Sequence, residues 1–132
     1  MSDGRMYVLR VFLVEDSPTI RQNLAAALEE LAPVQIVGWA EEAGSAVAEL
    51  QRQPPPCDLA IVDISLRSGS GLDVLRALQQ ANSSLHRVVL TNYAVTRLRD
   101  DCLALGAERV FDKSTDVEAL AAYCDMLAAR FG

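Results

Sequence analysis

The sequence predicts an α/β domain in which five short strands alternate with five helices and form a doubly wound parallel sheet. Five short apolar runs recur along the 132 residues, and each is followed by a segment with apolar side chains at helical spacing. The runs are nearly continuous rather than alternating with polar residues, which is typical of strands buried on both faces. Parallel strands joined by helical crossovers satisfy both patterns.

The first strand and helix are predicted by the beginning of this pattern. Residues 9–14 read LRVFLV, a run of branched and aromatic side chains that favours a strand. Ser17 and Pro18 follow, and they suit the N-cap and the first position of a helix. A helix is therefore expected over 18–31, with an apolar stripe at spacings of three and four that covers the sheet.

Four further units repeat this order along the rest of the chain. The predicted strands are residues 34–40, 59–62, 88–90 and 110–111. The predicted helices are approximately residues 44–52, 72–81, 95–105 and 115–129. Three consecutive prolines at 54–56 end the second helix, because proline cannot continue one. No linker or repeat interrupts the series, so a single domain over 1–132 is expected, with its core at about 8–129.

The composition restricts the classes of function. Twelve basic residues against eighteen acidic ones give a net charge of −6 without a Lys/Arg cluster, so we expect no direct nucleic acid binding by this chain. Three widely spaced cysteines are typical of reduced thiols rather than of a disulfide framework. No apolar segment resembles a signal peptide or a membrane span, so no membrane contact is expected. These features predict a cytoplasmic protein.

Polar side chains stand where the predicted strands end. Glu15 and Asp16 follow the first strand, Asp63 the third, Thr91 the fourth and Lys113 the fifth. Ligands of open parallel sheets bind in the crevice beyond the carboxyl ends of the strands. We therefore expect these five side chains to converge on one crevice.

The chemistry of this set favours phosphoryl transfer. Carboxylates that converge in a crevice repel one another unless a cation compensates, and Mg²⁺ binds through a few carboxylates while it orients a phosphoryl group. Lys113 supplies a second positive charge, and Thr91 supplies a hydroxyl donor. A carboxylate nucleophile, a metal, a cation and a hydroxyl together make a phosphoryl-transfer site.

Each of these residues has a simpler interpretation when it is taken alone. Asp63 is then more typical of a turn cap, and an acid at 15 or 16 favours the start of the next helix by roughly 0.3–1 kcal/mol. Lys113 is then a solvated lysine and Thr91 a strand residue. Only the ordered set favours a site. His86 precedes a strand in a polar turn, which disfavours a phosphohistidine.

Four ordered strings resemble the receiver domains of two-component response regulators. The strings are VEDSP, IVDISL with GSGLDVL, VVLTNYA and GAERVFDKS, and the resemblance spans about residues 8–129. It implies a flavodoxin-like (βα)5 fold with strand order 2-1-3-4-5. It is compatible with a stand-alone receiver and with the receiver part of a longer DNA-binding transcription regulator.

The resemblance also implies a role for each residue of the set. Asp63 would be the phosphoryl acceptor, Thr91 would donate a hydrogen bond to the phosphoryl group, and Lys113 would neutralise it. The metal would be Mg²⁺, for which Mn²⁺ can substitute. Its ligands would be Glu15, Asp16, Asp63 and the backbone carbonyl of Ser65.

Several positions depart from the family pattern. Val110 stands where an aromatic switch residue is common, three residues before the lysine. Ser114 and Arg67 replace two usual prolines, which is expected to loosen their loops and leaves the Lys113–Ser114 bond to be determined as cis or trans.

Ser65 and Tyr93 occupy the two positions that tune loss of the phosphoryl group in this family. A bulky Tyr93 predicts slow self-dephosphorylation, and a half-life of only seconds would contradict this hypothesis.

The expected partners follow from the same resemblance. They are a sensor histidine kinase or a histidine phosphotransfer protein, and an output protein or second copy on the face of the fourth helix, fifth strand and fifth helix.

Two rival functions remain open. An aspartyl-phosphate hydrolase would need a general acid where Ser65 stands, and a constitutive binding module would not need the intact polar set.

Overall fold

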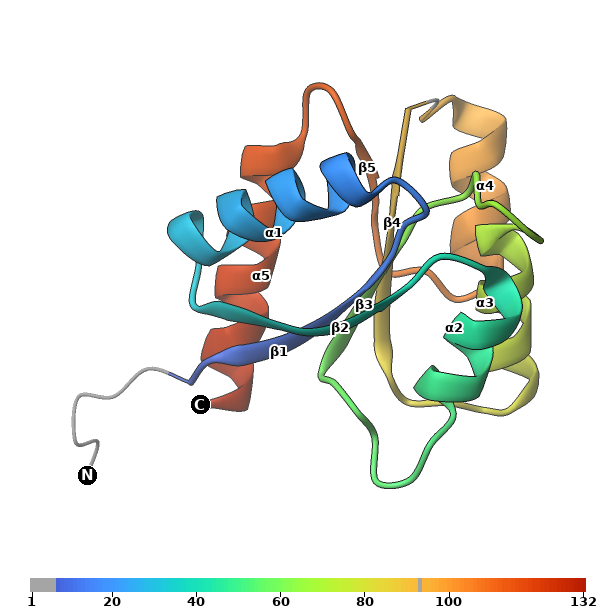
Figure 1. The fold of residues 1–132 in the computed structure, drawn as a ribbon, viewed down its shortest axis with the longest axis horizontal. Coiled ribbons are helices and arrows are strands. Elements are labelled where there is room, and N and C mark those ends of the chain that lie inside the picture. The colour runs from blue at the N-terminus through green and yellow to red at the C-terminus, as the bar shows by residue number, and fades with distance from the viewer. Residues whose placement is uncertain (1–6, 93) are drawn as a thin grey trace.

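The computed structural model describes residues 7–92 and 94–132, and these residues form five parallel strands and five helices (Figure 1). The strands are β1 (Leu9–Val14), β2 (Val34–Ala40), β3 (Leu59–Val62), β4 (His86–Thr91) and β5 (Val110–Asp112). The helices are α1 (Pro18–Leu31), α2 (Ala43–Leu50), α3 (Gly71–Gln80), α4 (Thr96–Ala104) and α5 (Val117–Phe131). The strand order is β2-β1-β3-β4-β5. The predicted fold class and strand order are therefore confirmed.

The helices lie in two layers, one on each face of the sheet. In Figure 1, α1 and α5 cover one face, and α2, α3 and α4 cover the other. One apolar cluster joins β1, β3 and β4 to α1 and α5, and two smaller clusters join the opposite face to α2, α3 and α4. The central strands β1, β3 and β4 are therefore largely buried on both faces, which explains their continuous apolar sequence, whereas the edge strand β2 exposes Gln35, Val37 and Trp39.

The predicted boundaries differ from the observed ones by two residues at most. β4 begins at His86 because His86 and Arg87 continue the parallel pairing with β3, although their polarity is typical of a turn. α5 begins at Val117 rather than 115. The reason is local, since the Asp116 carboxylate accepts a hydrogen bond from the Asp112 N–H at 2.9 Å and holds a turn before the helix.

Both helices that follow the acid-bearing strands have side-chain caps. Ser17 Oγ accepts the Ile20 N–H at 3.2 Å, and Pro18 occupies the first turn of α1. Ser70 and Asp73 form a capping box at α3. These caps fix where each helix begins and so restrict the length of the turns that carry Glu15, Asp16 and Asp63.

Gly71, the first residue of α3, lies directly against the backbone that follows β3. A Cβ added at Gly71 would lie 2.2 Å from the Asp63 carbonyl oxygen and 2.9 Å from the Ile64 Cα. Because both are backbone atoms, Gly71→Ala is expected to lower the free energy of unfolding by about 3 kcal/mol, as overpacking does. Urea denaturation measures this loss.

Gly44→Ala is the matched control, since a Cβ there meets no atom within 4 Å and Gly44 lies in α2. This control should be neutral or stabilise by up to about 1 kcal/mol. Equal stability of the two variants would show that the loop after β3 yields to the added methyl group.

Candidate functional site

The carboxyl ends of β1 and β3 bring three carboxylates together. One oxygen from each of Glu15, Asp16 and Asp63 lies within 4.8 Å of the others. Glu15 is 3% exposed and Asp63 is 4% exposed, whereas Asp16 is partly exposed. The structure therefore places these three residues in one crevice, as the strand-end pattern predicts.

Backbone pairing fixes the positions of the two buried acids. The Glu15 N–H donates to the Ala40 carbonyl at 2.9 Å, and the Asp63 N–H donates to the Val14 carbonyl at 2.9 Å. Each acid thus directly extends a strand of the sheet. The Glu15 carboxylate also accepts the Ser17 N–H at 3.1 Å, which turns its side chain back over the start of α1.

Lys113 joins the two buried carboxylates. Its Nζ donates to Glu15 Oε1 at 2.5 Å and to Asp63 Oδ2 at 2.9 Å, and its side chain is 10% exposed. The other Asp63 oxygen accepts the Ser65 N–H at 3.4 Å. Lys113 therefore supplies positive charge at the position where the carboxylates would otherwise repel each other.

Burial and ion pairing act in opposite directions on the charges of this cluster. Burial raises the pKa of Glu15 above its ordinary value, although Lys113 and the Ser17 N–H oppose that rise. Burial lowers the pKa of Lys113, but its hydrogen bonds to Glu15 and Asp63 outweigh burial, and the net direction is upward. Lys113 is therefore held in its charged form.

Thr91 and Lys113 come from neighbouring strands at the same edge. Thr91 is buried at the end of β4, and its carbonyl accepts the Lys113 N–H at 2.9 Å. The oxygen-rich donor set of Glu15, Asp16 and Asp63 fits a hard divalent cation such as Mg²⁺, which prefers carboxylates and retains waters.

The other predicted positions have separate environments. Val110 is buried on β5 in the apolar cluster between the sheet and α4. The Lys113–Ser114 bond is trans, because Gln53–Pro54 is the only cis peptide bond among the described residues. Ser114 donates both its N–H and its hydroxyl to Asp112. Tyr93 lies outside the described residues.

Sequence reasoning missed Arg21 and Glu41, which lie beside the acid cluster. Arg21 Nη1 donates to the Glu15 carbonyl oxygen at 2.9 Å and to Glu41 Oε1 at 3.4 Å. In the sequence, Arg21 is one of several polar residues on the first helix. No local signal indicates that its side chain turns toward the end of β1.

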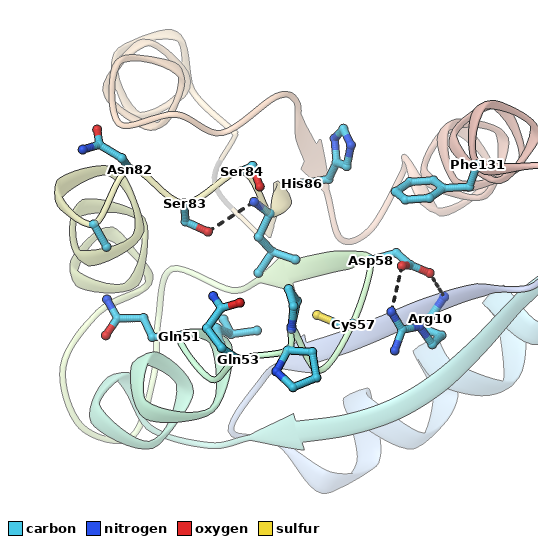
Figure 2. Close-up of a pocket in the computed structure, with 15 residues that line it drawn as sticks. Arg10, Gln51, Gln53, Cys57, Asp58, Asn82, Ser83, Ser84, His86 and Phe131 are labelled. Carbon is cyan, nitrogen blue, oxygen red and sulfur yellow. Dashed lines mark hydrogen bonds and ion pairs between the residues drawn. The ribbon is translucent and has the colours of Figure 1, made fainter.

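A cavity of about 870 Å³ lies at the opposite end of the sheet (Figure 2). Figure 2 shows Arg10 and Asp58 paired at its edge, at 3.1 Å, with His86 and Phe131 on another side. The Phe131 ring, at the end of α5, stacks on Tyr7 at 5.4 Å between centroids. None of the predicted site residues lines this cavity.

His86 lines that cavity and contacts an acid rather than the crevice. Its Nδ1 lies 2.9 Å from both carboxylate oxygens of Glu108. His86 is the first residue of β4 rather than part of a turn before it, so the predicted placement of His86 was wrong.

The fold and the acidic crevice define a doubly wound α/β domain with a carboxylate-rich site at the carboxyl ends of its strands. A model of the response regulator receiver domain family matches residues 11–125 of the chain. The chain therefore belongs to the response regulator receiver domain family. Members of this family are signalling switches of two-component systems rather than classical enzymes, they bind Mg²⁺ at their acidic pocket, and they interact with histidine kinases.

The curated relatives of this chain include response regulators and other regulatory proteins of bacteria. The two-component response regulator PhoP of Pseudomonas aeruginosa is 32% identical over 123 residues, which cover 92% of this chain and 52% of PhoP. The acid tolerance regulatory protein ActR of Rhizobium meliloti is 30% identical over 119 residues, which cover 90% of this chain and 56% of ActR. The chain thus spans about half the length of the curated relatives it matches.

Solved structures support the same assignment. The signal receiver domain of a Luxo repressor protein from Vibrio parahaemolyticus superposes with a TM-score of 0.80 at 25% identity. The alignment covers 92% of this chain and 91% of that chain.

Across the described residues, no helix combines the length and the apolar character needed to cross a bilayer.

Proposed function

We propose that this chain is a Mg²⁺-dependent phosphorylation switch whose acceptor is Asp63. The observation that carries the proposal is the Lys113 ammonium, which bonds Asp63 and Glu15 at once inside the acidic crevice. The donor is a phosphohistidine of a sensor histidine kinase or of a histidine phosphotransfer protein, because such kinases are the partners of this family.

Phosphoryl transfer to Asp63 needs a free carboxylate oxygen and compensation of the incoming charge. One Asp63 oxygen forms a bond to phosphorus while the bond from phosphorus to the histidine nitrogen breaks, and the nitrogen keeps the electron pair. The product is an acyl phosphate. Lys113 neutralises oxygens of the transferred group, and the Thr91 hydroxyl donates a hydrogen bond to it.

The metal ligands are Glu15, Asp16, Asp63 and the backbone carbonyl of Ser65. The oxygens of the three acids already lie close enough together to share an ion. Mg²⁺ supplies positive charge to the phosphoryl oxygens when it is bound, and Mn²⁺ can replace it because it accepts the same hard ligands.

The output of the switch is the face formed by α4, β5 and α5. Arg99 of α4 donates to the Val110 carbonyl of β5 at 2.9 Å, so α4 is attached to the strand that leads to Lys113. Val110 is buried at this junction and can bias the face through packing without an aromatic side chain. An output protein or a second copy of the chain binds there.

The proposal also includes the setting of this switch. Residues 1–132 act as a single receiver domain in the cytoplasm, without direct contact to nucleic acid or membrane. The regulators named above are about twice as long as the part aligned with this chain. The chain is therefore either a stand-alone receiver or the receiver part of a longer transcription regulator.

Acetyl phosphate tests the proposal because it replaces the kinase with a small phosphodonor. We expect self-catalysed, Mg²⁺-dependent addition of one phosphoryl group, detected by mass spectrometry and prevented by a chelator. The modification should be lost slowly, over far longer than seconds, since Tyr93 and Ser65 occupy the tuning positions. No modification would favour a constitutive binding module, and steady phosphate release would favour a hydrolase.

A further inference from the structure

Two arginines meet one glutamate beside the acidic crevice. Glu41, in the turn between β2 and α2, accepts from Arg21 Nη1 at 3.4 Å through Oε1 and from Arg67 Nη1 at 3.1 Å through Oε2. Arg21 belongs to α1, and Arg67 lies in the loop after β3. The glutamate therefore bridges two segments that are far apart in sequence, one after Glu15 and Asp16 and the other after Asp63.

Arg21 holds the turn that carries the acid pair. Its side chain is 12% exposed, and its Nη1 donates to the Glu15 carbonyl oxygen at 2.9 Å. The guanidinium also lies 5.1 Å from the centroid of the Trp39 ring on β2. Since the guanidinium is planar and packed against a ring, few other positions are open to it, and the Glu15 backbone is held with it.

Arg67 holds the loop that follows Asp63. Its side chain is 61% exposed, so its ion pair with Glu41 is a weak contact by itself. A backbone bond reinforces it, because the Ala43 N–H donates to the Ser68 carbonyl at 3.0 Å. Together these contacts attach the loop that contains Ser65 to the start of α2.

We propose that Arg21 and Arg67 are positioning residues that act through Glu41 and fix the distance between the two backbone segments that bind Mg²⁺. One segment carries Glu15 and Asp16, and the other carries Asp63 and Ser65. The inference rests on the proposed function, since it concerns the metal site of that switch. Residues that orient metal ligands commonly change metal affinity by about 10–100-fold when they are replaced.

The sign of the effect separates positioning from simple electrostatics. Both arginines are cations beside a cation site, so removal of either positive charge should tighten Mg²⁺ binding if charge alone mattered. Positioning predicts the opposite result. Arg21→Gln should weaken Mg²⁺ binding about tenfold, and the more exposed Arg67→Gln should weaken it about threefold.

Isothermal titration calorimetry with MgCl₂ on the full chain measures these dissociation constants. Arg52→Gln is the matched control, because Arg52 is an exposed arginine whose ion pair among the described residues is a local one, with Glu49 at 3.1 Å. It removes the same charge and should change the dissociation constant by less than about twofold. Arg67→Lys keeps one cationic donor for Glu41 and should restore most of the affinity.

Coupling between the two arginines provides a second readout. Because both act through Glu41, the double variant Arg21→Gln/Arg67→Gln should weaken binding by less than the product of the two single effects. Unchanged or tighter Mg²⁺ binding in both single variants would overturn the inference. If Arg21→Gln does not fold, the Arg67 variants and their rescue decide the question. If the wild type binds no Mg²⁺, the proposed function itself fails.

Discussion

Asp63→Asn is expected to abolish phosphoryl uptake from acetyl phosphate, with a loss of more than about a thousandfold in rate, as removal of a nucleophile produces. Asp63 is 4% exposed, and its backbone N–H pairs with β1, so the substitution leaves the position of the side chain unchanged. An amide of the same shape has no carboxylate oxygen that can form an acyl phosphate. Intact-mass spectrometry after incubation with Mg²⁺ measures the result.

The control for this variant is Asp125→Asn, which makes the same change at an exposed position of α5. It should be modified to the same extent as the wild type. Modification of Asp63→Asn at the wild-type rate would show that another side chain accepts the phosphoryl group. Peptide mapping would then locate the true acceptor.

Lys113→Met is expected to lower the free energy of unfolding by about 3 kcal/mol in the absence of divalent cations. The substitution leaves the buried carboxylates of Glu15 and Asp63 without the ammonium that bonds both. A buried charge whose partner is removed costs far more than the pair contributes. Urea denaturation in a chelating buffer measures the loss.

Mg²⁺ should restore much of that stability, since it replaces the missing positive charge. A ligand at 100 times its dissociation constant stabilises the folded state by about 2.7 kcal/mol, and the variant should bind Mg²⁺ more tightly than the wild type does. Arg52→Met, at an exposed ion pair, should cost less than about 0.5 kcal/mol and show no such rescue. Equal losses in both variants would refute the structural role of Lys113.

The fold was predictable because burial of the sheet between two layers of helices requires strands with a continuous apolar sequence, and that pattern is visible in the chain. Continuous apolar strands require cover on both faces, and each strand stops where polar residues begin. The positions of Glu15, Asp16, Asp63, Thr91 and Lys113 at one edge follow from that topology. The meeting of Glu15, Asp16, Asp63 and Lys113 in one crevice therefore needed no knowledge of side-chain contacts.

The contacts between these residues were less predictable. A lysine at the end of the fifth strand gives no indication of which acids its flexible side chain reaches, and the structure shows that it reaches two. Arg67 was expected to loosen its loop as a replacement for proline. Its ion pair with Glu41 depends on the approach of the β2–α2 turn, which no local pattern encodes. The close packing of Gly71 against Asp63 also arises only in three dimensions.

The stacking of Phe131 on Tyr7 has a practical consequence for labelling experiments. It brings the last turn of α5 to the beginning of the described chain, beside the amino end of β1 (Figure 1). A dye or surface tether attached next to Tyr7 or Phe131 would therefore lie at the amino end of β1, away from the acidic crevice. Phosphodonors would still reach the opposite edge, so immobilised protein is suited to kinetic measurements of phosphorylation.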